Sequence, residues 1–150
     1  MKPFPPVLLA IGMLLVYLLG QAAQSGNLGP LFDNPRLHIS GWVLLVLGVA
    51  GVISLIFKFR KNETTVLPDG TPTNLMTDGI YAYSRNPIYV LMGIALFGVV
   101  LINGAWIGLT VLPVFLALVN VLWIRFEEAQ LEAQFGQVYL DYKTSVRKWL

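Results

Sequence analysis

A polar and aromatic stretch, TTVLPDGTPTNLMTDGIYAYSRNPIY, precedes an apolar segment that begins at Pro87. Proline favours the first turn of a helix, and a helix start carries free backbone N–H groups and a partial positive charge. Asn86, Pro87 and their neighbours could therefore hold a carboxylate or another polar ligand group, with Arg85 adding a full charge. Alternatively, Arg85 is only a topological anchor, and three tyrosines form an aromatic belt at a membrane interface. These tyrosines are Tyr81, Tyr83 and Tyr89.

A second set of polar residues, Arg125, Glu127 and Glu128, follows the last long apolar segment. Successive residues on a helix point about 100° apart, so the two carboxylates cannot both face the same neighbour. One carboxylate facing inward could accept hydrogen bonds from the ammonium group or hydroxyls of a ligand, while the other is solvated. Equally, both carboxylates could be solvated and simply support a helix.

The composition indicates which kind of fold must position these residues. The 150 residues are 56% hydrophobic and only 12% charged, and the mean hydropathy is +0.69, whereas soluble domains are about one quarter charged. The chain has no cysteine and one histidine, which excludes disulfides and thiolate chemistry and argues against a metal centre. The net charge of +2 is too small to indicate nucleic acid binding. We therefore expect a membrane protein with neither a metal nor a nucleic acid partner.

The apolar segments predict an all-α, single-domain integral membrane protein with four transmembrane helices. We expect helices at about residues 5–22, 39–58, 87–102 and 105–126, a cytoplasmic loop at 59–86 and a short amphipathic helical tail at 127–150. The first segment also fits a cleaved signal peptide, and we favour a retained helix. Asn103 and Gly104 predict a tight turn that makes the last two helices an antiparallel hairpin.

The distribution of positive charge predicts the orientation. With a cytoplasmic N-terminus, nine of the ten Lys and Arg residues lie inside and only Arg36 lies outside. The positive-inside rule then places both termini and the loop at 59–86 in the cytoplasm.

Small residues and aromatic residues predict how the helices pack. Gly48, Gly51 and Ser54 recur at intervals of three and form a strip that allows another helix to approach closely. In the tail, apolar residues recur every three or four positions, and Gly136 is expected to divide it into two short helices. The recurring residues are Leu131, Phe135, Tyr139, Tyr142, Val146 and Trp149.

The stretch GIYAYSRNPIY, followed about 40 residues later by EEAQLEAQFGQVYLDYKTSVRKWL, resembles the isoprenylcysteine carboxyl methyltransferase family. We use that name in the broad sense that includes bacterial phospholipid methyltransferase-like membrane proteins. The resemblance covers roughly residues 64–150. It implies a bacterial inner-membrane methyltransferase that uses S-adenosylmethionine, and its partners would be membrane lipids and a lipophilic methyl acceptor.

The resemblance also implies site residues. The cofactor would lie between the loop before the third helix and the start of the tail, in contact with Thr73, Asn74, Leu75, Met76, Tyr81, Asn86, Pro87, Ile88, Tyr89 and Glu127. We place Arg85, Arg125 and Glu128 in the catalytic set, where either arginine could hold an anionic acceptor.

Two positions depart from the family pattern. Many members have histidine where this chain has Asn86, and arginine one turn before the glutamate pair where it has Trp123. Asparagine does not titrate near neutral pH, so a proton step that depends on histidine is excluded there. Without the second arginine, carboxylate recognition would fall to Arg125 or be absent.

Two other functions are compatible with the sequence. A small four-helix transporter fits the size, but the cores of the apolar segments lack the ionisable residues that usually couple transport. A noncatalytic membrane scaffold would explain Asn86 and Trp123. The sequence predicts neither the acceptor atom nor the oligomeric state.

Overall fold

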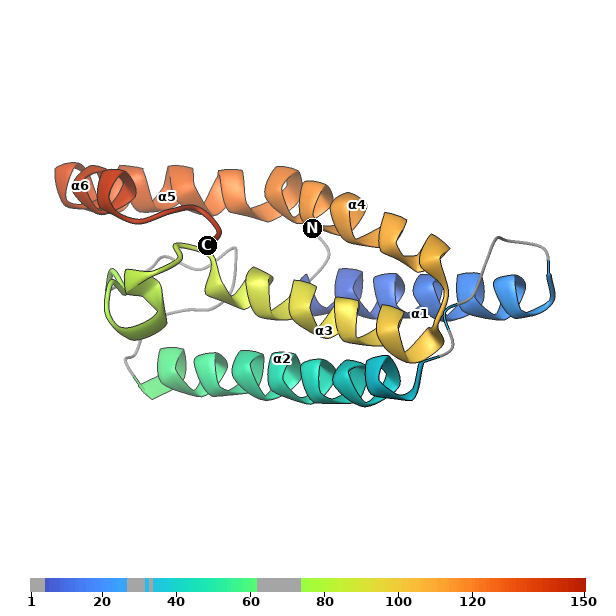
Figure 1. Cartoon of the computed structure of the whole chain (residues 1–150). Coiled ribbons are helices and arrows are strands. Elements are labelled where there is room, and N and C mark those ends of the chain that lie inside the picture. The colour runs from blue at the N-terminus through green and yellow to red at the C-terminus, as the bar shows by residue number, and fades with distance from the viewer. Residues whose placement is uncertain (1–4, 27–31, 33, 62–73) are drawn as a thin grey trace.

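The computed structural model describes residues 5–26, 32, 34–61 and 74–150, and this part of the chain is helical without strands (Figure 1). The long helices of the N-terminal half are α1 (Pro5–Gln24) and α2 (Pro35–Lys61). A short 3-10 helix, η1 (Gly79–Ala82), precedes α3 (Pro87–Asn103). The C-terminal half contains η2 (Trp106–Thr110), α4 (Val111–Val119), the π-helical turn η3 (Asn120–Ile124), α5 (Arg125–Phe135) and α6 (Gln137–Ser145).

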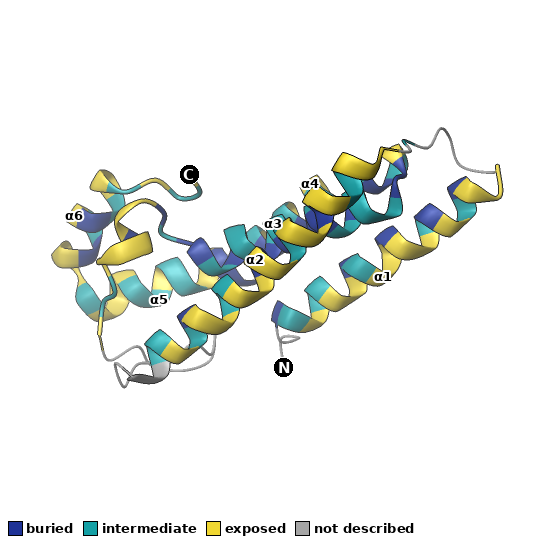
Figure 2. Cartoon of the chain, turned by 60° about the horizontal axis from the view of Figure 1, so that its bottom comes forward, coloured by how far each residue is buried: buried dark blue, intermediate teal, exposed yellow. Residues whose placement is uncertain are grey.

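Three helical runs are long and apolar enough to cross a membrane. They are Pro5–Gln24, Pro35–Phe59 and Trp106–Phe135, and α3 is a shorter apolar helix. Large apolar side chains are exposed along α1 and α2, including Leu14 and Val46 at 57% and 60% exposure (Figure 2). Apolar faces of this extent are unusual on soluble monomers and are typical of surfaces that contact lipid.

The helices α2 and α3 lie side by side (Figure 1) because glycines remove the side chains between them. A Cβ atom on Gly48 would lie 2.7 Å from the backbone of Leu91 and Ala95, and one on Gly98 would lie 2.6 Å from the Gly41 carbonyl oxygen. The close contact predicted for the strip is confirmed at Gly48 and Gly51, whereas Ser54 is exposed and its hydroxyl donates to the Ala50 carbonyl of its own helix. The sequence analysis missed the participation of Gly41 and Gly98.

The turn between α3 and η2 has the tight geometry that the Asn-Gly pair predicts. Gly104 adopts a left-handed conformation with φ of 68°, and its N–H donates to the Val100 carbonyl. This conformation favours glycine. The returning helix packs into one buried apolar cluster with α3 and α1, which includes Val16, Leu96, Phe115 and Trp123.

The last apolar run is longer than the sequence predicts. We expected a helix to about residue 126, whereas the run continues without a break to Phe135. Its 30 residues correspond to about 45 Å, which is longer than the hydrocarbon thickness of about 30 Å that one crossing requires. Gly136, with φ of 52°, then separates α5 from α6, as expected.

Replacing Gly98 with alanine tests the α2–α3 contact. The new methyl group meets the backbone of α2, which cannot move away without separating the helices. We expect Gly98→Ala to lower the free energy of unfolding in detergent by about 1–3 kcal/mol. Gly93→Ala on the same helix is the control, because its Cβ would lie 3.6 Å from a flexible Leu116 side chain. Equal thermal stability of the two variants would contradict the close contact.

Candidate functional site

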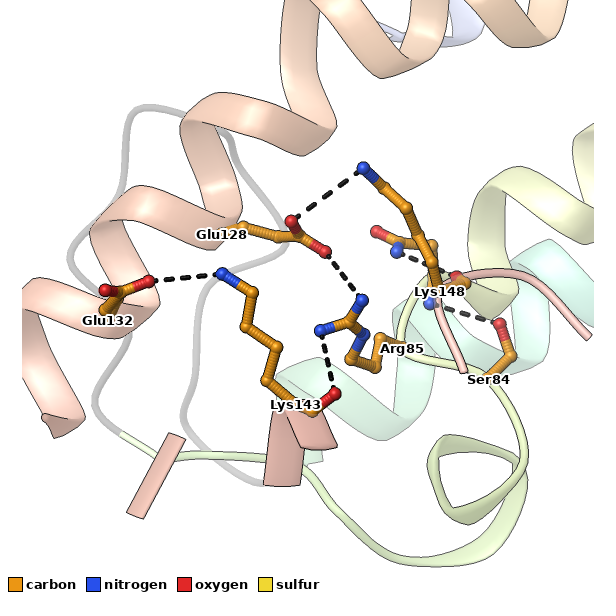
Figure 3. A network of polar contacts seen from close by, with 7 residues as sticks. Ser84, Arg85, Glu128, Glu132, Lys143 and Lys148 are labelled. Carbon is orange, nitrogen blue, oxygen red and sulfur yellow. Dashed lines mark hydrogen bonds and ion pairs between the residues drawn. The ribbon is translucent and has the colours of Figure 1, made fainter. Parts of the chain in front are cut away.

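The C-terminal segment after α6 returns to the start of α3 and is held there by the backbone. The Arg85 N–H donates to the Arg147 carbonyl at 2.9 Å, and the Asn86 side-chain amide donates to the Lys148 carbonyl at 3.0 Å. The Asn86 N–H donates to the Ser84 hydroxyl (Figure 3). The bonds to Arg147 and Lys148 join residues that are 62 positions apart in the sequence. They hold the C-terminal segment against the start of α3.

An ion pair between Arg85 and Glu128 lies at the centre of this arrangement (Figure 3). The Arg85 Nη2 and Glu128 Oε1 atoms are 3.4 Å apart, and the two side chains are only 11% and 16% exposed. Lys148 Nζ lies 3.8 Å from the other oxygen of Glu128, and Arg85 Nη1 donates to the Lys143 carbonyl at 3.3 Å. Arg85 is thus a partly buried structural cation and more than a surface anchor.

The neighbouring Glu127 faces a different partner, as the helical spacing predicts. Its Oε1 atom accepts a hydrogen bond of 2.5 Å from the Tyr89 hydroxyl. Tyr89 is buried on the first turn of α3. The structure therefore places one carboxylate against the start of α3 and the other against Arg85.

Two further tyrosines connect η1 to α6. The Tyr142 hydroxyl donates to the Tyr81 carbonyl at 2.8 Å, and both residues are buried. Burial raises the pKa of Tyr81, and nearby Tyr142 and Glu127 raise it further. Burial also raises the pKa of Tyr142 to about 12, while Arg85 acts in the opposite direction. Both hydroxyls therefore remain protonated at neutral pH.

Bonds within the protein already use much of the hydrogen-bonding capacity at the start of α3. The Tyr89 and Val90 N–H groups donate to the Asn86 carbonyl, and Pro87 has no N–H. The N–H groups of Arg85 and Asn86 are also bonded, to Arg147 and Ser84. This helix start offers fewer donors to a ligand carboxylate than the sequence predicts.

The remaining predicted residues occupy varied positions. Asn74, Leu75 and Met76 precede η1, with Asn74 exposed and the other two half-buried. Pro87 is buried, and Ile88 packs against the apolar cluster. Arg125 is exposed and takes no part in the ion pair between Arg85 and Glu128. Thr73 lies outside the described residues.

Some participants were missed by the sequence analysis because they act through local geometry. Ser84 is almost fully buried and accepts from the backbone of Asn86, and Lys148 contributes its carbonyl as well as its charge. The basic run near the C-terminus was the available signal for Lys148, but it was interpreted only as part of the charge bias. No sequence pattern identified Ser84.

Two buried atoms of the central ion pair, Arg85 Nε and Glu128 Oε1, have no hydrogen-bond partner within the described structure. At 3.4 Å, Glu128 Oε1 is close enough to Arg85 for electrostatic attraction but too far for a strong charged hydrogen bond. A buried polar atom without a partner is costly. One donor and one acceptor are thus available beside Glu127.

Comparison with known proteins identifies the family of this chain. The family described as phospholipid methyltransferase matches residues 37–138, which is about two thirds of the sequence. The chain belongs to the phospholipid methyltransferase family. This match confirms the resemblance inferred from the sequence, and membership implies methyl transfer to a lipid-related substrate.

The chain also resembles an individual protein whose function is not described. Over 46 residues the chain is 41% identical to an uncharacterized protein of Haemophilus influenzae, and this segment covers 31% of the chain and 68% of that protein. No solved structure matches the chain significantly.

Removing the charge of Glu128 tests the central ion pair. Glu128→Gln leaves the partly buried Arg85 guanidinium without a counter-charge, so we expect a loss of about 2 kcal/mol in the free energy of unfolding. Glu132→Gln is the matched control, because Glu132 and its partner Lys143 are 46% and 35% exposed and such pairs contribute about 0.5 kcal/mol or less. Chemical denaturation in mild detergent measures both. A Glu128→Gln variant as stable as the control would contradict a structural role for the ion pair.

The Tyr142 hydroxyl predicts how stability depends on alkaline pH. Because the pKa of Tyr142 is raised to about 12 in the folded protein and is about 10 when unfolded, the unfolded state loses its proton first. The stabilisation from this group is complete below about pH 10 and falls as the pH rises toward about 12. We expect Tyr142→Phe to be about 1 kcal/mol less stable at neutral pH and to lose less stability across that alkaline range. Parallel pH profiles of the two proteins would contradict this assignment.

Proposed function

We propose that this protein transfers a methyl group from S-adenosylmethionine to a lipid or lipophilic small molecule at the cytoplasmic face of a bacterial inner membrane. The observation that carries the proposal is the position of Glu127. Its carboxylate is held by Tyr89, next to the Arg85–Glu128 ion pair, in the second half of the helical run Trp106–Phe135. All these residues lie within the part of the chain that matches the family.

The proposed topology has four spans with both termini in the cytoplasm. Three helical runs meet the length of a span, and the 17 residues of α3 correspond to about 25 Å, which a locally thinned bilayer accommodates. Nine of ten basic residues then lie on the cytoplasmic side. In this arrangement α5 and α6 extend beyond the membrane and hold the C-terminal segment against the start of α3.

The side chains around Glu127 are compatible with an adenosyl cofactor. A carboxylate suits the cofactor's ammonium group or ribose hydroxyls, and the Tyr81 ring, which is also near Glu127, suits an aromatic base. When bound, S-adenosylmethionine supplies a methyl group that is already activated by its sulfonium.

The chain's own contribution is then positioning and the exclusion of water. The apolar cluster beside Tyr89 excludes water from the membrane side of the site, and the C-terminal segment covers the start of α3. His38, the only histidine in the sequence, lies near Gly104 at the other end of α3, so we assign it no role in the site. The charge of Arg85 is already balanced by Glu128, which makes an anionic acceptor a poor fit for this arginine.

Calorimetric titration of the purified protein in detergent tests the proposal. We expect saturable binding of S-adenosylmethionine, and Glu127→Gln should weaken it about tenfold or more, because a charge-assisted hydrogen bond is lost. The Glu132→Gln variant, altered at an exposed carboxylate on the same helix, should bind like the original protein. No detectable binding at millimolar cofactor would contradict the proposal.

Lipid extracts connect binding to turnover. Cells with the protein should contain a lipid or lipophilic compound that is heavier by one CH2 group than its counterpart in cells without it. Glu127→Gln should abolish the heavier species while the protein remains in the membrane. If the variant still produces it, Glu127 does not hold the cofactor.

A further inference from the structure

The long C-terminal apolar run contains one irregular turn, η3, at Asn120–Ile124. Here the Arg125 N–H donates to the Asn120 carbonyl, five residues back, which is the hydrogen bond of a π-helix. Such widened turns are less stable than α-helix and occur frequently at functional sites. The turn follows α4 directly and precedes the glutamate pair by less than one helical turn.

Two buried polar atoms in this turn have no hydrogen-bond partner within the described structure: Trp123 Nε1 and Asn120 Oδ1. The Trp123 side chain is fully buried, at 0% exposure. An unpaired polar group in an apolar environment is destabilising, and a lipid environment offers no water to relieve it. By contrast, Asn103 on α3 donates to the Val99 carbonyl at 3.0 Å. No group among residues 5–26, 32, 34–61 and 74–150 satisfies these two polar atoms of η3, which leaves them open to a ligand.

The surroundings of Trp123 select the chemistry of that partner. Trp123 belongs to the same buried apolar cluster as Tyr89 and Met92. The charges of Arg85 and Glu128 are already paired with each other. A charged ligand group would be desolvated within the apolar cluster around Trp123, which is strongly unfavourable.

We propose that Trp123 and Asn120 bind the uncharged hydroxyl end of a lipophilic methyl acceptor. An indole N–H can only donate and an amide oxygen can only accept, whereas a hydroxyl does both. This assignment rests on the proposed function, because it names the class of acceptor for the same site. It makes the acceptor an alcohol with an apolar body, and it excludes carboxylates and phosphates as the group recognised at η3.

The test measures binding at Trp123 without the cofactor. In 15N-labelled protein in detergent, the indole N–H signal of Trp123 is assigned by its loss in Trp123→Phe and followed during titration with dodecanol. Dodecane and dodecyl phosphate, which have the same chain length, control for entry into the micelle. We expect dodecanol alone to shift the signal in a saturable manner, and Asn120→Leu to weaken this binding about tenfold.

Trp106→Phe is the matched control, because Trp106 is half exposed in η2 and its removal should leave the dodecanol titration of Trp123 unchanged. The hydroxyl site is refuted if dodecanol leaves the Trp123 signal unmoved, or if dodecyl phosphate shifts it at lower concentration. Binding of S-adenosylmethionine is measured separately in each variant. Cofactor binding without a dodecanol response refutes only the hydroxyl site. A dodecanol response without cofactor binding refutes the proposed methyl transfer and, with it, the role of the bound alcohol as a methyl acceptor.

Discussion

A guanidinium group that is 11% exposed must have its charge balanced nearby, and in this protein Glu128 provides that balance from another helix. The ion pair connects the residue just before α3 with the first turn of α5. Because Glu127 is the next residue on the helix, fixing Glu128 against Arg85 also directs Glu127 toward Tyr89. The geometry of the candidate site thus follows from one charge-balance requirement and the 100° step of a helix.

The position of α3 depends on its packing against α2. Glycines on both helices let the backbones approach to distances that a methyl group would block. Tyr89 lies on the first turn of α3, so this contact positions one partner of Glu127. Packing by small residues is the usual way for helices to associate where the hydrophobic effect between them is weak. The glycines remote from the polar residues therefore help to determine the site.

Most of the molecule satisfies its buried polar groups, and the exceptions among the described residues gather in one region. Arg85, Glu128, Asn120 and Trp123 each have a buried atom without a hydrogen-bond partner. Three of the four lie on the helical run from Asn120 to Glu128. Such atoms destabilise the free protein, and their grouping on this helical run is what the proposed ligand site would explain.

The sequence by itself determined the apolar helices, the turn at Asn103–Gly104, the break at Gly136 and the family, because hydropathy, glycine conformation and motif spacing are local properties. It also placed Arg85, Tyr89, Glu127 and Glu128 among the important residues. Only the tertiary structure decided their partners. Residues that are far apart in the sequence meet in the pairs Arg85–Glu128 and Tyr89–Glu127 and in the return of the C-terminal segment to Asn86. The sequence also could not show that two polar atoms of η3 are buried without a partner in the described structure. Such contacts depend on how the helices pack, and packing is a property of the whole chain.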